Sequence, residues 1–263
     1  MNSKRILLSP PHMGGTELTY IAQAFQDNWI APAGPHIDLF ENRLVDFLDQ
    51  KSQVVALNSG TAAIHLGLQL LGVQKGDVVL CQSLTFIASV NPVLYLGATP
   101  VFIGSEKETW NLCPIALEEA ILNQLNKGIQ PKAIVVVHLY GMPAKMNEII
   151  TISKKYNIPI LEDAAEALGS SYTNQPCGTF GDFGVFSFNG NKVITTSGGG
   201  ALLCHSEAVK KKAVFLATQA KEDAVYYEHT QVGYNYRMSN ISASIGLGQL
   251  EVLSEHIQHR KQN

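Results

Sequence analysis

The sequence of 263 residues is poor in charge, in cysteine and in long apolar runs. Charged residues make up 16% of the chain, whereas an average globular domain has roughly 25%. This low fraction indicates that another subunit covers part of the surface. The 19 basic and 22 acidic side chains give a net charge of −3, which offers no electrostatic support for a nucleic-acid partner or an anionic membrane surface.

The sparse cysteines and short apolar runs exclude further classes of protein. The cysteines form neither a C-x-x-C pair nor a cluster with histidine, so we expect no bound metal and no disulfide framework; they are Cys81, Cys113, Cys177 and Cys204. No run approaches the roughly 20 apolar residues of a membrane-spanning helix. The apolar stretch after Met1 is too short for a signal-peptide core. A cytoplasmic protein in a reducing compartment is therefore expected.

Seven short apolar runs rich in Val and Ile recur along the chain. Such runs are typical of strands that are covered on both faces. They occupy residues 54–58, 77–81, 99–103, 133–139, 158–163, 184–188 and 200–204. Helical spacing lies between several of them. This alternation predicts an α/β fold, a three-layer sandwich with a mainly parallel seven-stranded sheet.

The two ends of the chain have no strand pattern. Helices are predicted at residues 18–25 and 37–48, and residues 207–260 are expected to be mostly helical around the polar sequence GYNYRMSN. The expected organisation is an N-terminal helical segment at 1–50, a large domain at 51–240, and the start of a further helix at 241–263.

Candidate site residues follow the predicted strands, because ligands of parallel sheets bind at the carboxyl ends of the strands. The first run is followed by Ser59-Gly-Thr-Ala-Ala63, which opens a helix. Free N–H groups and a hydroxyl at a helix start favour phosphate. An ordinary cap made by Ser59 or Thr61 explains the same residues, so both interpretations stay open.

Asp163 ends an otherwise apolar strand, where a carboxylate is costly unless it meets a cation or a donor. Its partner is predicted to be a metal, a ribose hydroxyl or a protonated ring nitrogen; the alternative is a cap on a following helix. The neighbouring Glu162 points to the opposite face of the strand, so the two carboxylates need not form an acid/base pair.

Lys192 lies between two buried strands, among Gly and Ser residues. Desolvation favours the neutral, nucleophilic form of a lysine amine, which makes this residue a candidate Schiff-base lysine. The alternative is an exposed hairpin lysine, just as Lys210 to Lys212 are expected on a solvated helix face. A phosphate site, an acid for a pyridinium nitrogen and a lysine for an aldehyde together are what a pyridoxal phosphate (PLP) enzyme supplies. Phe86 is a candidate for stacking on the ring, although core packing explains a single Phe equally well.

These residues lie in strings that resemble the DegT/DnrJ/StrS family of PLP-dependent sugar aminotransferases, of fold type I. The strings include NWIAPAGP, NSGTAAIHLGL, ILEDAAEALGS, SFNGNKVITTSGGG and GYNYRMSN, in the family's order. The string SFNGNKVITTSGGG is most similar to the branch of the family that aminates UDP-linked 4-keto-6-deoxy-N-acetylhexosamines, in bacillosamine and exopolysaccharide synthesis.

The resemblance implies a role for each matching residue. Lys192 would bond to the cofactor aldehyde and later move a proton, Asp163 would keep the ring nitrogen protonated, and Phe86 would stack on the ring. Glu166 would lie near the ring hydroxyl. The phosphate site would consist of Gly60, Thr61, Ala62 and Ser187, with Asn235 from a second subunit. The implied substrate residues are Asn28, Trp29, Ile30, Ala31 and Ser59, with Arg237 for the carboxylate of the amino donor.

The resemblance further implies a homodimer, glutamate as amino donor and a nucleotide sugar as acceptor. Lys192 argues against the family members that dehydrate the sugar, because those replace this lysine by histidine. Family members normally continue into a C-terminal small domain, which this sequence lacks. A fragment without catalytic activity, with or without PLP, is therefore the alternative function. A nicotinamide-dependent oxidoreductase is disfavoured because no G-x-G-x-x-G turn follows the first strand.

Overall fold

The computed structural model describes residues 7–48 and 50–262. Residues 1–6, which hold the beginning of the stretch assessed for a signal peptide, lie outside the described part of the chain. The described part contains no helix with the length and apolarity needed to cross a membrane.

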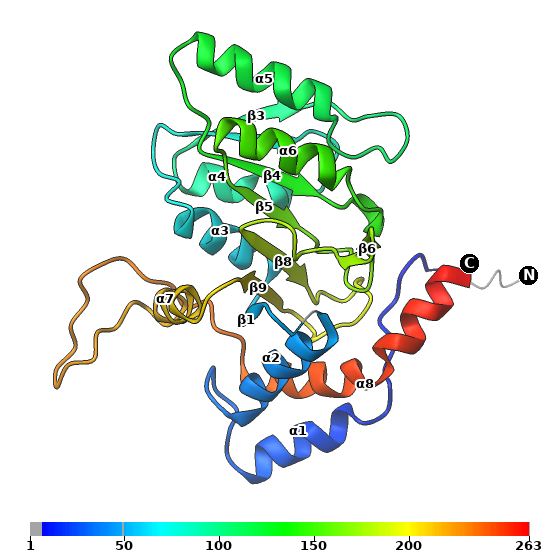
Figure 1. Ribbon diagram of the computed structural model, residues 1–263. Coiled ribbons are helices and arrows are strands. Elements are labelled where there is room, and N and C mark those ends of the chain that lie inside the picture. The colour runs from blue at the N-terminus through cyan, green and yellow to red at the C-terminus, as the bar shows by residue number, and fades with distance from the viewer. Residues whose placement is uncertain (1–6, 49, 263) are drawn as a thin grey trace, which may run out of the picture.

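A seven-stranded sheet forms the centre of the molecule (Figure 1). Its order is β1-β9-β8-β5-β4-β2-β3, and all pairs are parallel except those that β9 makes with β1 and β8. The strands are β1 (Gln53–Leu57), β2 (Val78–Gln82), β3 (Thr99–Ile103), β4 (Ala133–Val137), β5 (Ile160–Asp163), β8 (Phe183–Ser187) and β9 (Gly200–Cys204). Each of the seven predicted runs is confirmed as a strand.

Helices cover both faces of the sheet because neighbouring strand residues point to opposite sides. In β2, Val79 and Cys81 pack toward α3 (Gly60–Leu70) and α4 (Asn91–Tyr95), whereas Val78 and Leu80 pack toward α5 (Pro114–Asn126) and α6 (Met146–Tyr156). α7 (Glu207–Ala217) joins the first face. The second face is completed by α2 (Pro35–Leu48) and α8 (Asn240–Gln262). The predicted three-layer sandwich is confirmed.

The two ends of the chain pack together. α1 (Glu17–Gln26) and α2 both contact α8, and Figure 1 shows them on one side of the β1 end of the sheet. The predicted helices at 18–25 and 37–48 are confirmed as α1 and α2. The division of the chain at residues 50 and 240 remains a prediction, although α8 does begin at Asn240.

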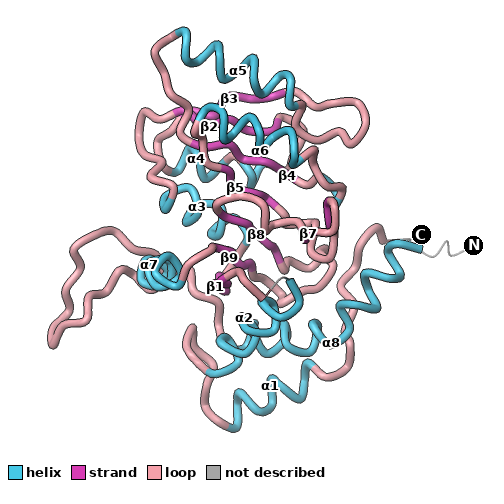
Figure 2. The backbone as a smooth tube through the Cα atoms, in the orientation of Figure 1, coloured by secondary structure: helices cyan, strands magenta, loops and turns pink. Residues whose placement is uncertain are grey.

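Two local predictions are wrong, and one small element was not predicted. Residues 218–232 are not helical, whereas the loop predicted at GYNYRMSN is confirmed over residues 233–239; Figure 2 shows the long loop that leaves α7 and projects from the molecule. A small hairpin, β6 (Ser171–Tyr172) and β7 (Gln175–Pro176), was not predicted because its strands are too short to show a pattern. β3 is not covered on both faces, since it is an edge strand whose Phe102 is exposed.

The buried carboxylate of Glu41, on α2, joins three parts of the chain. It accepts hydrogen bonds from the Ala56 N–H at 2.8 Å and from the Arg237 guanidinium, and its other oxygen lies 3.0 Å from Lys210 Nζ. The prediction of a solvated lysine face is therefore wrong for Lys210. A buried carboxylate with two cationic partners stabilises the fold chiefly because removing it leaves the partners uncompensated.

We expect Glu41→Gln to lower the free energy of unfolding by about 3 kcal/mol, because the partly buried Arg237 and Lys210 lose their counterion. Urea unfolding followed by circular dichroism measures the change. The control is Asp38→Asn, since Asp38 is exposed and lies 3.8 Å from the Arg237 guanidinium; it should cost less than about 1 kcal/mol. Equal losses in the two variants would contradict this role of Glu41.

Candidate active site at the carboxyl ends of the strands

The first turn of α3 leaves two backbone donors free. Ser59 Oγ accepts a hydrogen bond from the Ala62 N–H at 3.0 Å, and Ser59 O accepts one from the Ala63 N–H at 3.1 Å. The predicted cap by Ser59 is thus confirmed. The Ser59 side chain binds the N–H of Ala62, while the N–H groups of Gly60 and Thr61 make no hydrogen bond to any other described residue.

Close backbone approaches place Ser187 beside this turn. A Cβ on Gly60 would lie 3.0 Å from the Ser187 Cβ, and a Cβ on Gly200 would lie 2.4 Å from the Gly60 nitrogen. Only glycine fits at either position without moving its neighbours. The ends of β8 and β9 and the start of α3 therefore form a small cradle, with the Ser187 hydroxyl and two free N–H groups, which suits a phosphate.

Asp163 is the last residue of β5 and is only 5% exposed. Its Oδ2 accepts a hydrogen bond from Ser89 Oγ at 2.6 Å, and its Oδ1 accepts one from the Ala165 N–H at 3.1 Å. Burial raises the pKa of Asp163, against the opposing effects of these two donors and of the nearby Lys192. No helix follows within residues 164–170, so the alternative interpretation as a helix cap is wrong.

The segment after β2 brings Phe86 to the site and adds a residue that the sequence analysis missed. Phe86 precedes the 3-10 turn Ile87–Ser89, and its carbonyl accepts a hydrogen bond from the Ser89 N–H at 3.1 Å. Its side chain is 76% exposed, so core packing does not explain it. Ser89 also lies 2.8 Å from the Thr85 hydroxyl. A hydroxyl three residues after the predicted stacking Phe was the available signal.

Lys192 lies in the loop between β8 and β9, and its side chain is only 14% exposed. Its amine lies 3.3 Å from Glu166 Oε1, while Glu166 Oε2 accepts the Tyr140 N–H at 2.9 Å. The alternative of an exposed hairpin lysine is therefore wrong. The structure brings Lys192, Glu166 and Asp163 to one region, at the ends of neighbouring strands.

Glu162 faces away from Asp163, as the strand alternation predicted. It is fully buried and accepts hydrogen bonds from the N–H groups of Gly178, Phe180 and Gly181, at 2.6 to 2.8 Å. His138 Nδ1 accepts the Ala144 N–H, so its proton is on Nε2 and is donated to Glu162 at 2.9 Å. Sequence reasoning missed His138. Its backbone N–H also binds the Asp163 carbonyl, at 3.1 Å, and so ties this network to the site.

The predicted sugar-binding residues Asn28 to Ala31 form the turn between α1 and α2. Trp29 and Ile30 expose about half of their surface, 46% and 49%. The turn is held by buried Asn240, which donates from Nδ2 to the Trp29 carbonyl at 2.9 Å and from its backbone N–H to the Ala31 carbonyl at 2.9 Å. The sequence analysis did not identify Asn240, because its role depends on contacts across more than two hundred residues.

Arg237 and Asn235 lie in the segment beside β1. The Arg237 guanidinium pairs with Glu41 and donates to the Ala56 carbonyl at 3.0 Å. Its predicted role toward a donor carboxylate remains a prediction. Asn235 is exposed, and its carbonyl accepts a hydrogen bond from Asn58 Nδ2 at 3.0 Å.

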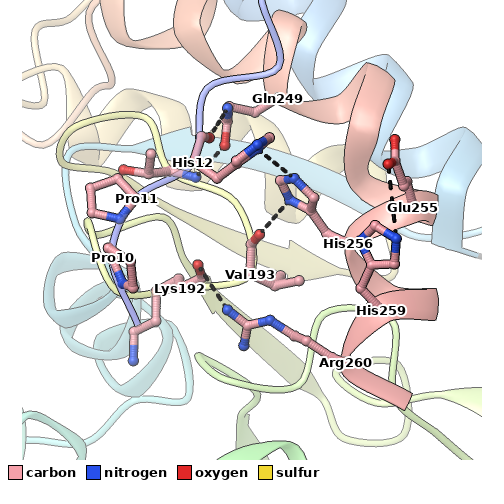
Figure 3. Close-up of a pocket in the computed structure, with 11 residues that line it drawn as sticks. Pro10, Pro11, His12, Lys192, Val193, Gln249, Glu255, His256, His259 and Arg260 are labelled. Atoms are coloured by element: carbon pink, nitrogen blue, oxygen red, sulfur yellow. Dashed lines mark hydrogen bonds and ion pairs between the residues drawn. The ribbon is translucent and has the colours of Figure 1, made fainter. Parts of the chain in front are cut away.

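A cavity of about 240 Å³ is lined by residues 10–12, by the loop around Lys192 and by α8. His256 donates from Nδ1 to the Val193 carbonyl at 3.1 Å and contacts His12 at 3.0 Å, and Arg260 approaches the Lys192 carbonyl at 3.5 Å. Figure 3 shows the Lys192 amine pointing away from the two histidines. The predicted cofactor residues other than Lys192 do not line this cavity. Nowhere in residues 7–48 or 50–262 do three metal-ligating side chains gather around one point.

Comparison with known proteins identifies the family. The sequence profile of the DegT/DnrJ/EryC1/StrS aminotransferase family matches residues 11–263. The protein named "Putative pyridoxal phosphate-dependent aminotransferase EpsN" from Bacillus subtilis (strain 168) is 54% identical over 258 residues, which cover 98% of this chain and 66% of that protein. GDP-perosamine synthase from Escherichia coli O157:H7 is 39% identical over 259 residues, with coverages of 98% and 69%.

A solved structure agrees with these sequence matches. PseC from Helicobacter pylori, an aminotransferase involved in the biosynthesis of pseudoaminic acid, superposes with a TM-score of 0.86 at 28% identity, covering 96% of this chain and 67% of that one. The chain thus spans about two thirds of the length of these relatives. With a profile match over nearly its whole length and the predicted fold, the chain belongs to the DegT/DnrJ/EryC1/StrS aminotransferase family.

Proposed function

We propose that this protein is a PLP-dependent aminotransferase that moves an amino group from glutamate to a nucleotide-linked 4-keto-6-deoxy sugar, for the synthesis of a cell-surface polysaccharide or glycan. The observation that carries the proposal is the buried Asp163 carboxylate, within electrostatic reach of the Lys192 amine. Similarity to EpsN and to GDP-perosamine synthase supports it. For the nucleotide we propose UDP, and GDP is the alternative to test.

The chemistry of the donor set fits PLP. The free N–H groups of Gly60 and Thr61 and the Ser187 hydroxyl suit the phosphate. Asp163 suits a protonated ring nitrogen, and the exposed face of Phe86 suits stacking on the ring. Glu166, near the Lys192 amine, is within reach of a ring hydroxyl there. Ala62 contributes less than expected, because its N–H is bound to Ser59.

When bound, PLP supplies an electrophilic aldehyde and an electron-accepting ring. Asp163 would hold a proton on the ring nitrogen, and its burial strengthens that interaction because no water competes for the carboxylate. Ser89 and the Ala165 N–H fix the direction of the carboxylate. Lys192 would bond to the cofactor and, once displaced, carry a proton to and from the substrate carbon. Glu166 would hold the Lys192 amine in place between these steps.

The substrate side of the site rests on exposed residues. Asn28 to Ala31 and Ser59 would line the sugar-nucleotide pocket, with the Trp29 ring available for stacking. Arg237 would bind the donor carboxylate, and to do so it would share its guanidinium with Glu41. A donor carboxylate therefore has to compete with an existing ion pair, which favours a dicarboxylate such as glutamate held by a second contact.

We also propose that the protein acts as a cytoplasmic homodimer. The projecting loop carries large exposed apolar side chains, Val225, Tyr226 and Tyr227, and such a patch is typical of an interface. In the dimer, Asn235 would reach the cofactor phosphate of the partner subunit. All four cysteines are free, which suits a reducing compartment.

The proposed function predicts a coloured protein. With PLP, the wild type should develop a visible absorbance band that borohydride bleaches and that Lys192→Ala abolishes. Glutamate should then discharge this band, and a UDP-linked or GDP-linked 4-keto-6-deoxy sugar should restore it. The Lys192→Ala variant should lose about a thousandfold in amination rate.

The control is Lys211→Ala, at an exposed lysine on α7, which should behave as the wild type. A wild type that stays colourless would overturn the proposed cofactor. A coloured protein whose band does not respond to glutamate would instead favour a role without catalysis.

A second prediction concerns the effect of the buried Asp163 carboxylate on the stability of the folded protein. Burial raises the pKa of Asp163. The ionised carboxylate therefore lowers the free energy of unfolding of the protein without cofactor. This cost is absent below the unfolded-state value of about 3.9 and grows as the pH rises through the raised folded-state pKa. Asp163→Asn keeps an acceptor for the Ala165 N–H and a partner for Ser89. Without PLP, the variant should therefore be more stable than the wild type at pH 8, with the difference shrinking toward pH 4.

Urea unfolding across this pH range measures the difference, and PLP titration should show weaker binding by the same variant. Asp46→Asn, at an exposed position on α2, provides the control for removing one acidic charge. A less stable Asp163→Asn variant at pH 8, or a difference that does not depend on pH, would contradict the assignment.

A further inference from the structure

The segment Gly233–Arg237 runs from the end of α7, where the Tyr234 N–H donates to the Leu216 carbonyl at 2.7 Å, to the outer edge of β1. An isolated bridge joins Leu57 to Arg237, and the Asn58 N–H donates to the Tyr236 carbonyl at 2.8 Å. Asn58 Nδ2 also donates to the Asn235 carbonyl at 3.0 Å. This backbone is therefore held beside the residue that precedes Ser59, at the start of the proposed phosphate site.

Two tyrosines of this segment face α3. Tyr236 Oη lies 3.0 Å from His65 Nδ1, and the rings of Tyr234 and Tyr236 stack with centroids 4.7 Å apart. The His65 and Tyr234 rings pack edge to face, with their centroids 5.0 Å apart. His65 is 5% exposed, and its burial lowers its pKa, so a neutral imidazole meets the Tyr236 hydroxyl at neutral pH.

Asn235 lies between the two anchored tyrosines. Its backbone is extended, with a bridge to Thr218, so its side chain points away from the face that Tyr234 and Tyr236 share. The side chain is exposed, and its amide makes no hydrogen bond to any described residue. A rigid backbone thus presents an unpaired amide to a group outside this chain.

We propose that the hydrogen bond between His65 and Tyr236 positions Asn235, and that through it each α3 helix serves both cofactor sites of the dimer. This inference rests on the proposed function, in which Asn235 binds the cofactor phosphate of the partner subunit. The first turn of α3 presents Gly60 and Thr61 to the phosphate of its own subunit, and His65 lies about one turn further along the same helix. His65 and Tyr236 are positioning residues, because neither touches the cofactor.

Because Asn235 serves the partner's site, a substitution at Tyr236 affects PLP binding in the opposite subunit, which a purely structural role would not produce. Removing the Tyr236 hydroxyl releases Asn235 of the same chain, which serves the other site. PLP affinity should therefore fall in the subunit that does not carry the substitution. The loss of one hydrogen bond corresponds to a decrease of about fivefold.

Mixed dimers test this directly. In the first, one subunit carries Lys192→Ala and the other carries Tyr236→Phe, so the site that keeps Lys192 receives Asn235 from a chain with an intact Tyr236. In the second, one subunit carries both substitutions and the other is wild type, so the site that keeps Lys192 receives Asn235 from the substituted chain. Two affinity tags separate the mixed dimers, and the visible absorbance of Lys192-bound PLP gives the dissociation constant.

We expect about fivefold weaker PLP binding in the second dimer and no change in the first, relative to a dimer with Lys192→Ala in one subunit alone. Tyr95→Phe is the matched control, because the Tyr95 ring contacts His65 at 5.6 Å while its hydroxyl makes no hydrogen bond to the described residues; it should leave both values unchanged. His65→Gln, placed in the same two dimers, should reproduce the pattern and guards against a folding defect of one variant.

Weaker binding in the first dimer, in both dimers or in neither would overturn the inference. Sedimentation separates these outcomes from a failure of the proposed function. A wild type that binds PLP and transfers the amino group as a monomer would refute the positioning across subunits alone. A wild type that does not bind PLP would refute the proposed function as well.

Discussion

The burial of one carboxylate is the constraint on which the rest of the site depends. Asp163 ends β5 in a position where it is only 5% exposed, and among the described residues Ser89 and the Ala165 N–H donate to its carboxylate. A carboxylate so placed raises the energy of the folded protein until a cation arrives. The strand ends around it supply the remaining groups of the proposed cofactor site, and the neighbouring His138 and Glu162 fix the backbone from the opposite face.

The sheet topology explains why residues far apart in the chain meet here. β5 and β8 end, and α3 begins, at the same edge of the sheet. Asp163, Ser187 and Gly60 therefore converge there without long loops. Glycines at positions 60 and 200 allow the close approach, since a Cβ at either would meet its neighbours. Asp163, Ser187 and Gly60 are therefore held by regular strands and by one helix start, which gives this part of the site the rigidity that an electrostatic role requires.

The sheet was predictable because its signals are local, and the burial of Lys192 and Asp163 followed from the same local pattern. Apolar runs mark buried strands whatever their neighbours, and Lys192 and Asp163 adjoin such runs. The partners were not predictable, since Ser89, Glu41 and Asn240 show their roles only when segments that are far apart in the sequence pack together. Lys210 illustrates the error, because its helix pattern alone indicates solvent while its amine meets a buried carboxylate. Residues 218–232 were misjudged for a related reason, since the ends of this loop are fixed by a bridge from Thr218 to Asn235 and by one from Arg237 to Leu57 on β1.

The most direct test of the central claim is the protonation of the cofactor ring in the site of Asp163. PLP labelled with ¹⁵N at the ring nitrogen, bound to the wild type at neutral pH, reports this by its chemical shift. The account predicts the shift of a protonated ring nitrogen, and a shift toward that of a neutral ring in Asp163→Asn. The shift of a neutral ring nitrogen in the wild type would contradict the account.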